Sequence, residues 1–269
     1  EFSEPSNDRY ADLLFEAVSG KIDNRKIISL VLKKGGSRAG DIIVNTAGLV
    51  TQRMEDDIVG YWHFDEGTGT STYDASGNDN TGTFVSSPTW QSGSSCKAGQ
   101  CLSFNGSSDY IIGSGSSLNF QNKKEITLEA WFKIDGGIEN HAIINNGFNV
   151  YAYLMDIESG KVRFVIDMDW GSGGKDIYST TNTLRDNKWH HVVSVLESSS
   201  ATSSMKIYVD GDLETTKELS SYNISLSSNN FGIGQRQYGR HFNGLIDEVR
   251  IYNRALTASE ISAHYDDLK

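Results

Sequence analysis

Carboxylate and amide side chains recur at turn-like positions along most of the chain, and their oxygens suit a divalent cation. The set contains no His or Cys, and hard oxygen ligands of this kind are typical of calcium. Gly77 lies within the run 74–80 and permits the chain to turn around an ion. The same side chains also hydrogen-bond their own backbone in turns, and Asp247 has the alternatives of pairing with Arg250 or capping a strand. The candidate calcium ligands are Asp65, Asp74, Asn78, Asn80, Asp109 and Asp247, with Asp79 in the same run.

A second group of residues has the composition of a sugar-binding surface. Trp170 lies in a glycine-rich run over 168–174, and the run 235–241 mixes planar donors with an aromatic ring. Sugar recognition needs an aromatic face for the apolar side of the ring, and bidentate polar groups for hydroxyls or a carboxylate. The alternative is that Trp170 fills the core from a loop. The candidate glycan-binding residues are Tyr151 and Tyr153 on one strand face, Asp167, Asp169, Trp170, Arg236, Tyr238, Arg240 and His241.

Two further patterns suggest chemistry only weakly. Asp167 and Asp169 point to one strand face about 7 Å apart, which is within reach of an inverting glycosidase pair. Ligand-binding or solvated carboxylates are the favoured interpretation, so no catalytic residue is predicted. His190 and His191 are adjacent and cannot both face one metal from a strand, so they are interpreted as structural.

Short strands have to position these groups. From Ile58 onward, alternating runs such as 125–134, 161–167 and 205–209 are separated by Gly, Ser, Asn and Asp, and Asp210-Gly211 is a hairpin turn. Roughly a dozen strands in about 210 residues predict two packed antiparallel sheets, that is, an all-β jelly-roll sandwich. Helices and strands do not alternate along the sequence, so a parallel sheet is not expected.

The first 55 residues have a different pattern. They hold equal numbers of acidic and basic side chains, so the whole net charge of -11 lies in residues 56–269. Apolar residues from Tyr10 to Val18 recur at helical spacing, and strand-like segments follow at 27–32 and 41–44, joined by a turn-rich loop at 33–40. We therefore expect a helix-plus-hairpin module over 1–55 and a β module over 56–269. A module of about 55 residues is marginal alone, so it is expected to pack against something else.

Composition excludes several classes. The chain of 269 residues contains 10% aromatic side chains, which rules out global disorder. The acidic net charge argues against nucleic-acid partners. The sequence contains no run of 18 apolar residues, the length needed to span a bilayer. Cys96 and Cys101 enclose Gly99, and this spacing favours a disulfide across a hairpin in an exported protein. A free cysteine pair in a cytosolic protein is the alternative.

Several motifs resemble the laminin-G-like jelly roll of the concanavalin A-like lectin/glucanase superfamily. They begin with Tyr61-Trp-His-Phe-Asp-Glu-Gly67 and continue in the family's order to Phe242–Leu256 and a short helix at Ser259–Tyr265. The resemblance implies a calcium ion at a sandwich edge, structural first and ligand-adjacent second. Glucanases of this superfamily carry a Glu-rich catalytic strand that no segment matches, so the protein is expected not to be an enzyme.

An amphipathic helix joined to such a module also resembles the modular minor pilins of type IV pili, although their leader and hydrophobic first helix are missing from this sequence. The resemblance implies an extracellular, cell-surface adhesin, displayed at a pilus tip, that binds host-cell glycans. Residues 1–55 would contact other pilin subunits, and membrane contact would require the missing helix. The alternatives are a glycoside hydrolase of the same superfamily and a protein-binding surface domain.

Overall fold

The computed structural model describes residues 57–269 except for 136–140, 148–149, 170–172, 200, 227 and 237–239, together with residues 33–34 and 37–38. The chain divides into two compact units, Glu1–Asp57 and Ile58–Lys269.

In the first unit, β1 (Lys33–Lys34) and β2 (Ser37–Arg38) pair antiparallel where the sequence predicted a loop. The two residues between them are both Gly, which two-residue hairpin turns favour. The helix expected from Tyr10 to Val18 and the strands expected at 27–32 and 41–44 lie outside the described residues.

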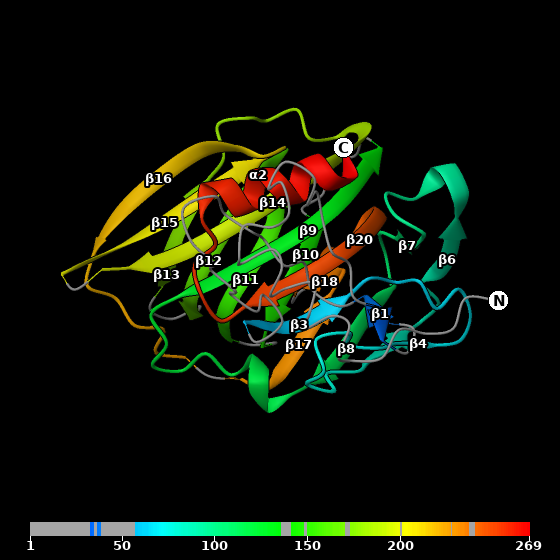
Figure 1. Cartoon of the computed structure of the whole chain (residues 1–269), viewed down its shortest axis with the longest axis horizontal. Coiled ribbons are helices and arrows are strands. Elements are labelled where there is room, and N and C mark those ends of the chain that lie inside the picture. The colour runs from blue at the N-terminus through cyan, green and yellow to red at the C-terminus, as the bar shows by residue number, and fades with distance from the viewer. Residues whose placement is uncertain are drawn as a thin grey trace, which may run out of the picture. The chain divides into compact units, whose positions relative to one another are not determined.

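The described part of the second unit contains two large antiparallel sheets, which confirms the predicted jelly-roll sandwich (Figure 1), and a separate two-stranded hairpin. The strands of one sheet, which we call sheet A, are β4 (Ser71–Thr72), β5 (Gly82–Val85), β8 (Tyr110–Ser114), β10 (His141–Asn146), β11 (Val150–Glu158), β12 (Lys161–Asp169), β13 (Gly173–Tyr178) and β17 (Asn230–Ile233). Their spatial order is β13-β12-β11-β10-β17-β8-β5-β4.

The other sheet, sheet B, has the order β16-β15-β14-β9-β20-β7-β6, with β3 paired to β20. Its strands are β3 (Ile58–Trp62), β6 (Thr89–Ser92), β7 (Gln100–Asn105), β9 (Ile126–Asp135), β14 (Asp186–Ser198), β15 (Thr202–Val209), β16 (Asp212–Ser220) and β20 (Asn243–Tyr252). Two 3-10 helices, η2 (Gly93–Ser95) and η3 (Ser116–Leu118), lie in the connections.

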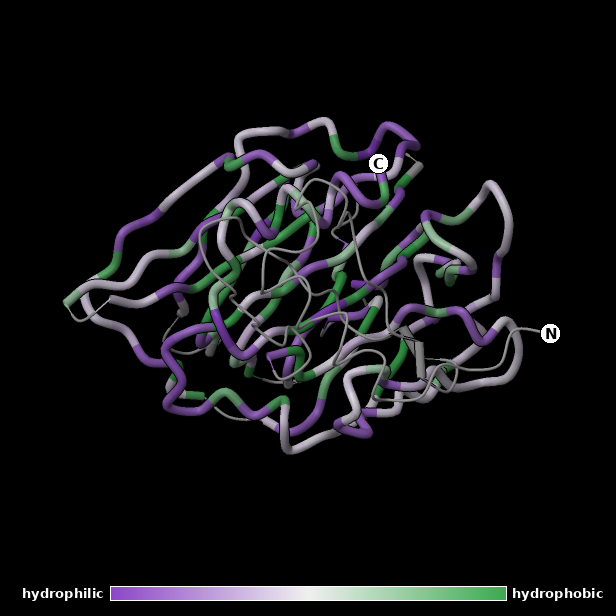
Figure 2. The backbone as a smooth tube through the Cα atoms, viewed as in Figure 1, coloured by the Kyte–Doolittle hydropathy of each residue, from purple (hydrophilic) through white to green (hydrophobic). Residues whose placement is uncertain are grey.

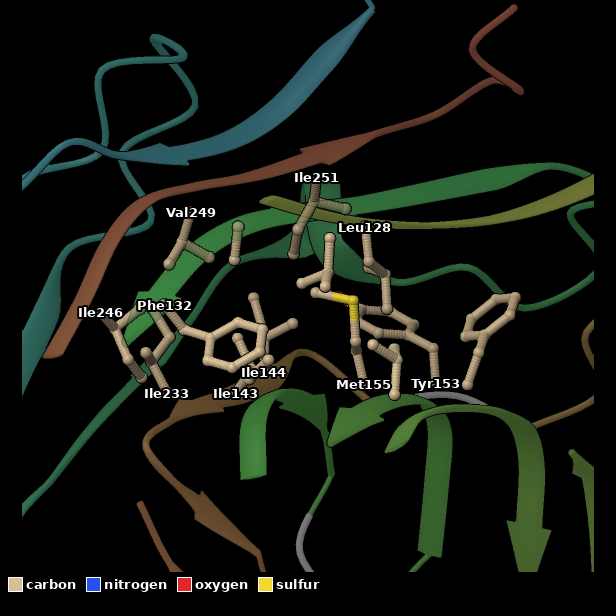
Figure 3. Packing of buried hydrophobic residues seen from close by; sticks show 14 of the residues in the cluster. Leu128, Phe132, Ile143, Ile144, Tyr153, Met155, Ile233, Ile246, Val249 and Ile251 are labelled. Carbon is tan, nitrogen blue, oxygen red and sulfur yellow. The ribbon is translucent and has the colours of Figure 1, made fainter. Parts of the chain in front are cut away.

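The core lies between the two sheets. Leu128 of β9 points toward Tyr153 and Met155 of β11, while Phe132 of β9 lies beside Ile144 of β10, and all five side chains are fully buried (Figure 3). Alternate residues of each strand face this layer because side chains on a strand have a period of two. Hydrophobic residues follow the central strands, and hydrophilic residues gather in the peripheral loops (Figure 2).

Helix α2 (Ala258–Leu268) covers the outer face of sheet B (Figure 1). Thr257 caps it: its side chain accepts from the backbone of Glu260, whose carboxylate accepts from the backbone of Thr257. Ile261 then packs in a second apolar cluster with Val193 and Tyr252 of the sheet. The helix extends beyond the predicted Ser259–Tyr265. None of the helices in the described residues is long and apolar enough to cross a membrane.

Candidate functional site

A short hairpin packs against β10 of sheet A. Its strands are β18 (Gln235–Arg236) and β19 (Arg240–His241). The chain leaves β17 through Gly234, whose φ is +79° and where a Cβ atom would lie 2.6 Å from the Phe104 ring. The Phe242 amide donates to the Gly234 carbonyl at 2.8 Å and closes the base of the hairpin. This turn directs the strands Gln235–Arg236 and Arg240–His241, both within the run proposed from the sequence, onto the sheet.

A carboxylate cluster lies beside the hairpin on the outer face of β11, β12 and β13. Glu158 is its centre: Oε2 accepts from Nη1 of Arg163 at 2.7 Å and from the Tyr178 hydroxyl at 2.7 Å. The hairpin supplies the third partner, since Nη1 of Arg240 lies 3.4 Å from Oε1. Burial alone would raise the pKa of Glu158, but the Tyr178 hydrogen bond and the Arg163 charge hold it below its usual range.

The second carboxylate of the cluster is buried. Asp156 is 1% exposed and forms ion pairs with Arg236 of the hairpin and with Nε of Arg163, the latter at 3.4 Å. The cluster thus contains two carboxylates and three guanidinium groups, the latter from Arg163, Arg236 and Arg240. It is therefore a locally cationic point on a strongly acidic module, and it can attract an anionic group.

Strand register explains why these side chains meet. The turn at Ser159 and Gly160 has positive φ at both residues, as two-residue hairpin turns require. It places Asp156 opposite Arg163, which in turn lies opposite Tyr178 of β13. Glu158 follows Asp156 at the alternation period and shares its face.

The exposed edge of this cluster has the groups that sugar recognition needs. Tyr178 is 36% exposed, the Arg240 side chain 38% and the Glu158 side chain 22%. We call these three residues the Glu158 group. An aromatic ring, a guanidinium and an oriented carboxylate are thus presented together at the surface.

The structure separates the two tyrosines proposed as a sugar platform. Both are fully buried. Tyr153 packs in the core between the sheets, whereas Tyr151 packs with Leu154 and Val165 in a separate cluster. They are structural, and the platform inferred from their alternation is wrong.

The proposed carboxylate pair is also divided. Asp167 is 7% exposed, and its carboxylate accepts from the Tyr222 hydroxyl, from the amide and hydroxyl of Ser225 and from the Leu226 amide, at 2.7 to 2.9 Å. Asp167 therefore binds the segment that follows β16, and its carboxylate is not available to a ligand. The backbone of Asp169 ends β12, while its side chain and the residues Trp170 and Tyr238 lie outside the described residues.

The proposed calcium ligands fall in separate places. Asp74 accepts from the amides of Tyr61, Ser76 and Asn80 and from the Asn80 side chain. Asn80 is buried, and its own oxygen accepts from Ser117. Asn78 is exposed and bonds Ser76. This run is a hydrogen-bonded turn, as the alternative interpretation stated.

Two more of the proposed calcium ligands, Asp65 and Asp247, accept hydrogen bonds from the disulfide loop. Cys96 and Cys101 form the predicted disulfide. Oδ2 of Asp247 accepts from the loop amides of Lys97 and Ala98 at 3.1 and 3.0 Å, and Oδ1 of Asp65 accepts from the Gln100 amide at 2.8 Å. Asp247 does not pair with Arg250, which instead binds Glu129 and Glu248.

Asp109 accepts from the amides of Ser87 and Asn105, in a third place. In each of these places, backbone N–H groups already donate to the carboxylate oxygens, so they occupy the positions from which a cation would bind. Burial also raises the pKa of Asp247 to about 8, which disfavours the charged form at neutral pH. The proposed residues therefore do not fit one calcium ion, and no group of three His, Cys, Asp or Glu in the described part of the chain can hold a metal. Bound calcium itself stays a prediction.

Sequence reasoning found Arg236 and Arg240 but missed their partners Asp156, Glu158, Arg163 and Tyr178. A signal existed, because acidic residues at 156 and 158 interrupt an otherwise apolar strand just before a two-residue turn. Reading the register across that turn would have paired Asp156 with Arg163.

A protein-family model described as the concanavalin A-like lectin/glucanases superfamily, Laminin_G_3, matches residues 105–262. No curated protein matches the chain. The solved structures that resemble it include the receptor-binding domain of botulinum neurotoxin C/D mosaic serotype, with a TM-score of 0.61 and 16% identity over 80% of this chain and 52% of that one.

The binding domain of botulinum neurotoxin DC is similar at TM-scores of 0.65 in its complex with rat synaptotagmin II and 0.63 in its complex with SialylT. Both matches have 16% identity and cover 80% of this chain and 52% of the other. The chain thus spans about half the length of these structures, and at this identity the likeness concerns the fold.

Proposed function

The chain belongs to the laminin-G-type family of the concanavalin A-like lectin/glucanases superfamily, and from that membership we propose that it is a non-catalytic carbohydrate-binding module. The observation that carries the proposal is the Glu158 group, in which Tyr178, Glu158 and Arg240 are all partly exposed on one face of sheet A. Superfamily membership alone would not decide the ligand, since one sandwich hosts many functions.

Each member of the group has a role in this proposal. The ring of Tyr178 packs against the apolar side of a sugar, while its hydroxyl fixes Glu158. Glu158 presents its oriented carboxylate as an acceptor to ligand hydroxyl groups. Arg240 contacts Glu158 through one nitrogen at 3.4 Å, so most of its five N–H donors can bind ligand hydroxyls or an acidic substituent.

The geometry supports binding over catalysis. Asp156 and Glu158 share a strand face about 7 Å apart, a separation that would suit an inverting glycosidase. Both are ion-paired to Arg163, however, and burial leaves Asp156 no access to a substrate. A general acid needs a raised pKa at an accessible carboxyl, whereas the pKa of Glu158 is lowered.

The wider role is an adhesin at the cell surface. The module would be the displayed head of a minor type IV pilin, bound to host-cell glycans, with residues 1–55 contacting other pilin subunits. The disulfide supports an oxidising, extracellular location. Binding at one site would be weak, roughly millimolar to micromolar, and several copies would add avidity.

A glycan array with the full chain tests the proposal, with Tyr178→Ala as the site variant and Tyr73→Ala as the matched control. Tyr73 is 63% exposed and lies outside the Glu158 group. The parent and the control should bind the same glycans, and Tyr178→Ala should lose them. An array with and without EDTA tests calcium. If the parent binds no glycan but captures a protein receptor, the protein-binding alternative replaces this function.

A further inference from the structure

Three polar atoms on the other side of the β18–β19 hairpin are buried without a hydrogen-bond partner. They are Oδ1 of Asn145, Oε1 of Gln235 and Nδ1 of His241. Asn145 as a whole is 1% exposed, while Gln235 and His241 are partly exposed. A buried polar group without a partner is costly, so such atoms mark places where something else supplies the bond.

Hydrogen bonds and strand register hold the three residues together. Nδ2 of Asn145 donates to the Gln235 carbonyl, and this bond leaves Oδ1 as the orphaned atom. Gln235 lies opposite His241 in the hairpin. A Cβ atom on Gly232 would lie 3.1 Å from Nδ2 of Asn145, so the bare backbone at Gly232 gives the amide its room.

An aromatic ring borders these atoms. The centroid of the Tyr110 ring lies 5.7 Å from that of His241, and Tyr110 is partly exposed. We call Tyr110, Asn145, Gln235 and His241 the Asn145 group. Its polar atoms belong to two amides, an imidazole and a phenol, without a carboxylate or a guanidinium.

We propose that the Asn145 group is a second subsite, which binds the hydroxyl groups of a neutral sugar residue. The partly exposed side chains of Gln235 and His241 contact the sugar hydroxyl groups, the buried Asn145 amide holds the Gln235 backbone beneath them, and Tyr110 covers the apolar face of the ring. This inference rests on the proposed carbohydrate-binding function and deepens it: the ligand is an oligosaccharide of at least two residues.

The hairpin connects the two subsites. Gln235 pairs with His241 and Arg236 pairs with Arg240, and consecutive pairs in a hairpin point to opposite faces. The first pair belongs to the Asn145 group, whereas the second contacts Asp156 and Glu158. An oligosaccharide that crosses the hairpin would meet a neutral subsite on one side and a charged subsite on the other.

The test uses the full chain with lactose, maltose and cellobiose as neutral probes, and with disaccharides that contain glucuronic acid as acidic probes. Gln235→Ala and Tyr110→Ala should weaken binding of both classes about tenfold, roughly the loss of one or two net interactions. Arg240→Ala should weaken mainly the acidic class. Gln121→Ala and Tyr73→Ala are exposed controls, and thermal melts verify that each variant folds.

The outcomes separate the two claims. If Gln235→Ala and Tyr110→Ala are folded and bind like the parent while Arg240→Ala loses binding, ordered water satisfies the Asn145 group; the subsite is then wrong and the proposed function stands. If the folded parent binds none of the probes and no glycan on a broader array, the proposed function fails first. If a neutral probe shifts the His241 imidazole resonances of the parent but not those of Gln235→Ala, the subsite is supported directly.

Discussion

The hydroxyl of Tyr178 donates a hydrogen bond to Oε2 of Glu158 at 2.7 Å across an intervening strand, since β12 separates β13 from β11. Arg163 on β12 binds the same oxygen at 2.7 Å, and its guanidinium lies 5.9 Å from the centroid of the Tyr178 ring. The carboxylate is therefore oriented from two strands, and Arg240 of the hairpin can approach its other oxygen. This arrangement distinguishes the Glu158 group from a collection of solvated charges.

Removing the ring or only its hydroxyl separates two roles of Tyr178. Tyr178→Ala should weaken glycan binding about tenfold or more, whereas Tyr178→Phe keeps the ring and should lose only a few-fold, as expected for one net hydrogen bond. Isothermal titration of both variants against an array-selected glycan measures the difference. Equal binding by Tyr178→Ala and the parent would remove Tyr178 from the site.

Asp167 should matter for stability and not for the ligand. Asp167→Ala leaves the donors of Tyr222, Ser225 and Leu226 without their acceptor, so we expect a loss of about 2–3 kcal/mol in the free energy of unfolding. Asp167→Asn is the matched control, because Asn keeps one acceptor oxygen and tolerates the observed φ of 51°. Denaturant melts measure both. A folded Asp167→Ala protein of parental stability that fails to bind glycans would reverse the assignment.

The disulfide should stabilise the module by more than its short loop implies. Chain entropy for a loop of this size gives about 2 kcal/mol. The loop amides that hold Asp247 and Asp65 add to that figure, because opening the loop also loosens these contacts. The double variant Cys96→Ser/Cys101→Ser should therefore melt clearly below the parent. An unchanged melting temperature would show that the loop is held without its covalent bond.

His190 gives the module a pH dependence with a defined sign. Its ring nitrogens lie 2.9 Å from Asp210 and 3.0 Å from Asp186, with Lys188 and Lys97 as the cations near those carboxylates. Burial alone would lower the pKa of His190, but the two carboxylates raise it above the usual value for histidine. Its stabilising contribution is thus complete below the unfolded pKa and is lost as pH rises through the higher folded pKa.

Denaturant melts between about pH 5 and pH 9 measure this effect, with His190→Gln as the control. The parent should be more stable than His190→Gln at the acidic end, and the difference should shrink as the pH rises through neutrality. A difference that is constant across this range would show that the ion pairs of His190 contribute nothing.

The sequence predicted the sandwich because the relevant signals are local. Alternation defines β9, β12 and β15, and Asp210-Gly211 forms the predicted turn with positive φ at both positions. The same reasoning failed on β11, whose residues from Tyr151 to Ile157 are all buried. A strand that is buried on both faces shows no polar alternation, so its pattern cannot tell which tyrosine faces a ligand.

The candidate site depends on contacts that local patterns do not encode. Asp167 meets Leu226, which lies 59 positions further along the chain, and the hairpin meets Asp156 across 80 positions. Arg236 and Arg240 could be proposed from their residue type, but whether their partners are ligands or buried carboxylates follows from the topology. The turn carboxylates, likewise, suit calcium by composition, and only the structure shows N–H donors already pointing at them.

Binding of an acidic oligosaccharide by the full chain, measured by isothermal titration for the parent and for Arg240→Ala, tests the central claim most directly. Arg240 is partly exposed and contacts Glu158 at 3.4 Å, so its removal should leave the fold intact. The dissociation constant of the parent should lie roughly between millimolar and micromolar, and Arg240→Ala should bind at least about tenfold more weakly at an unchanged melting temperature. Equal affinity of the two proteins would contradict the claim that this face of sheet A is the carbohydrate site.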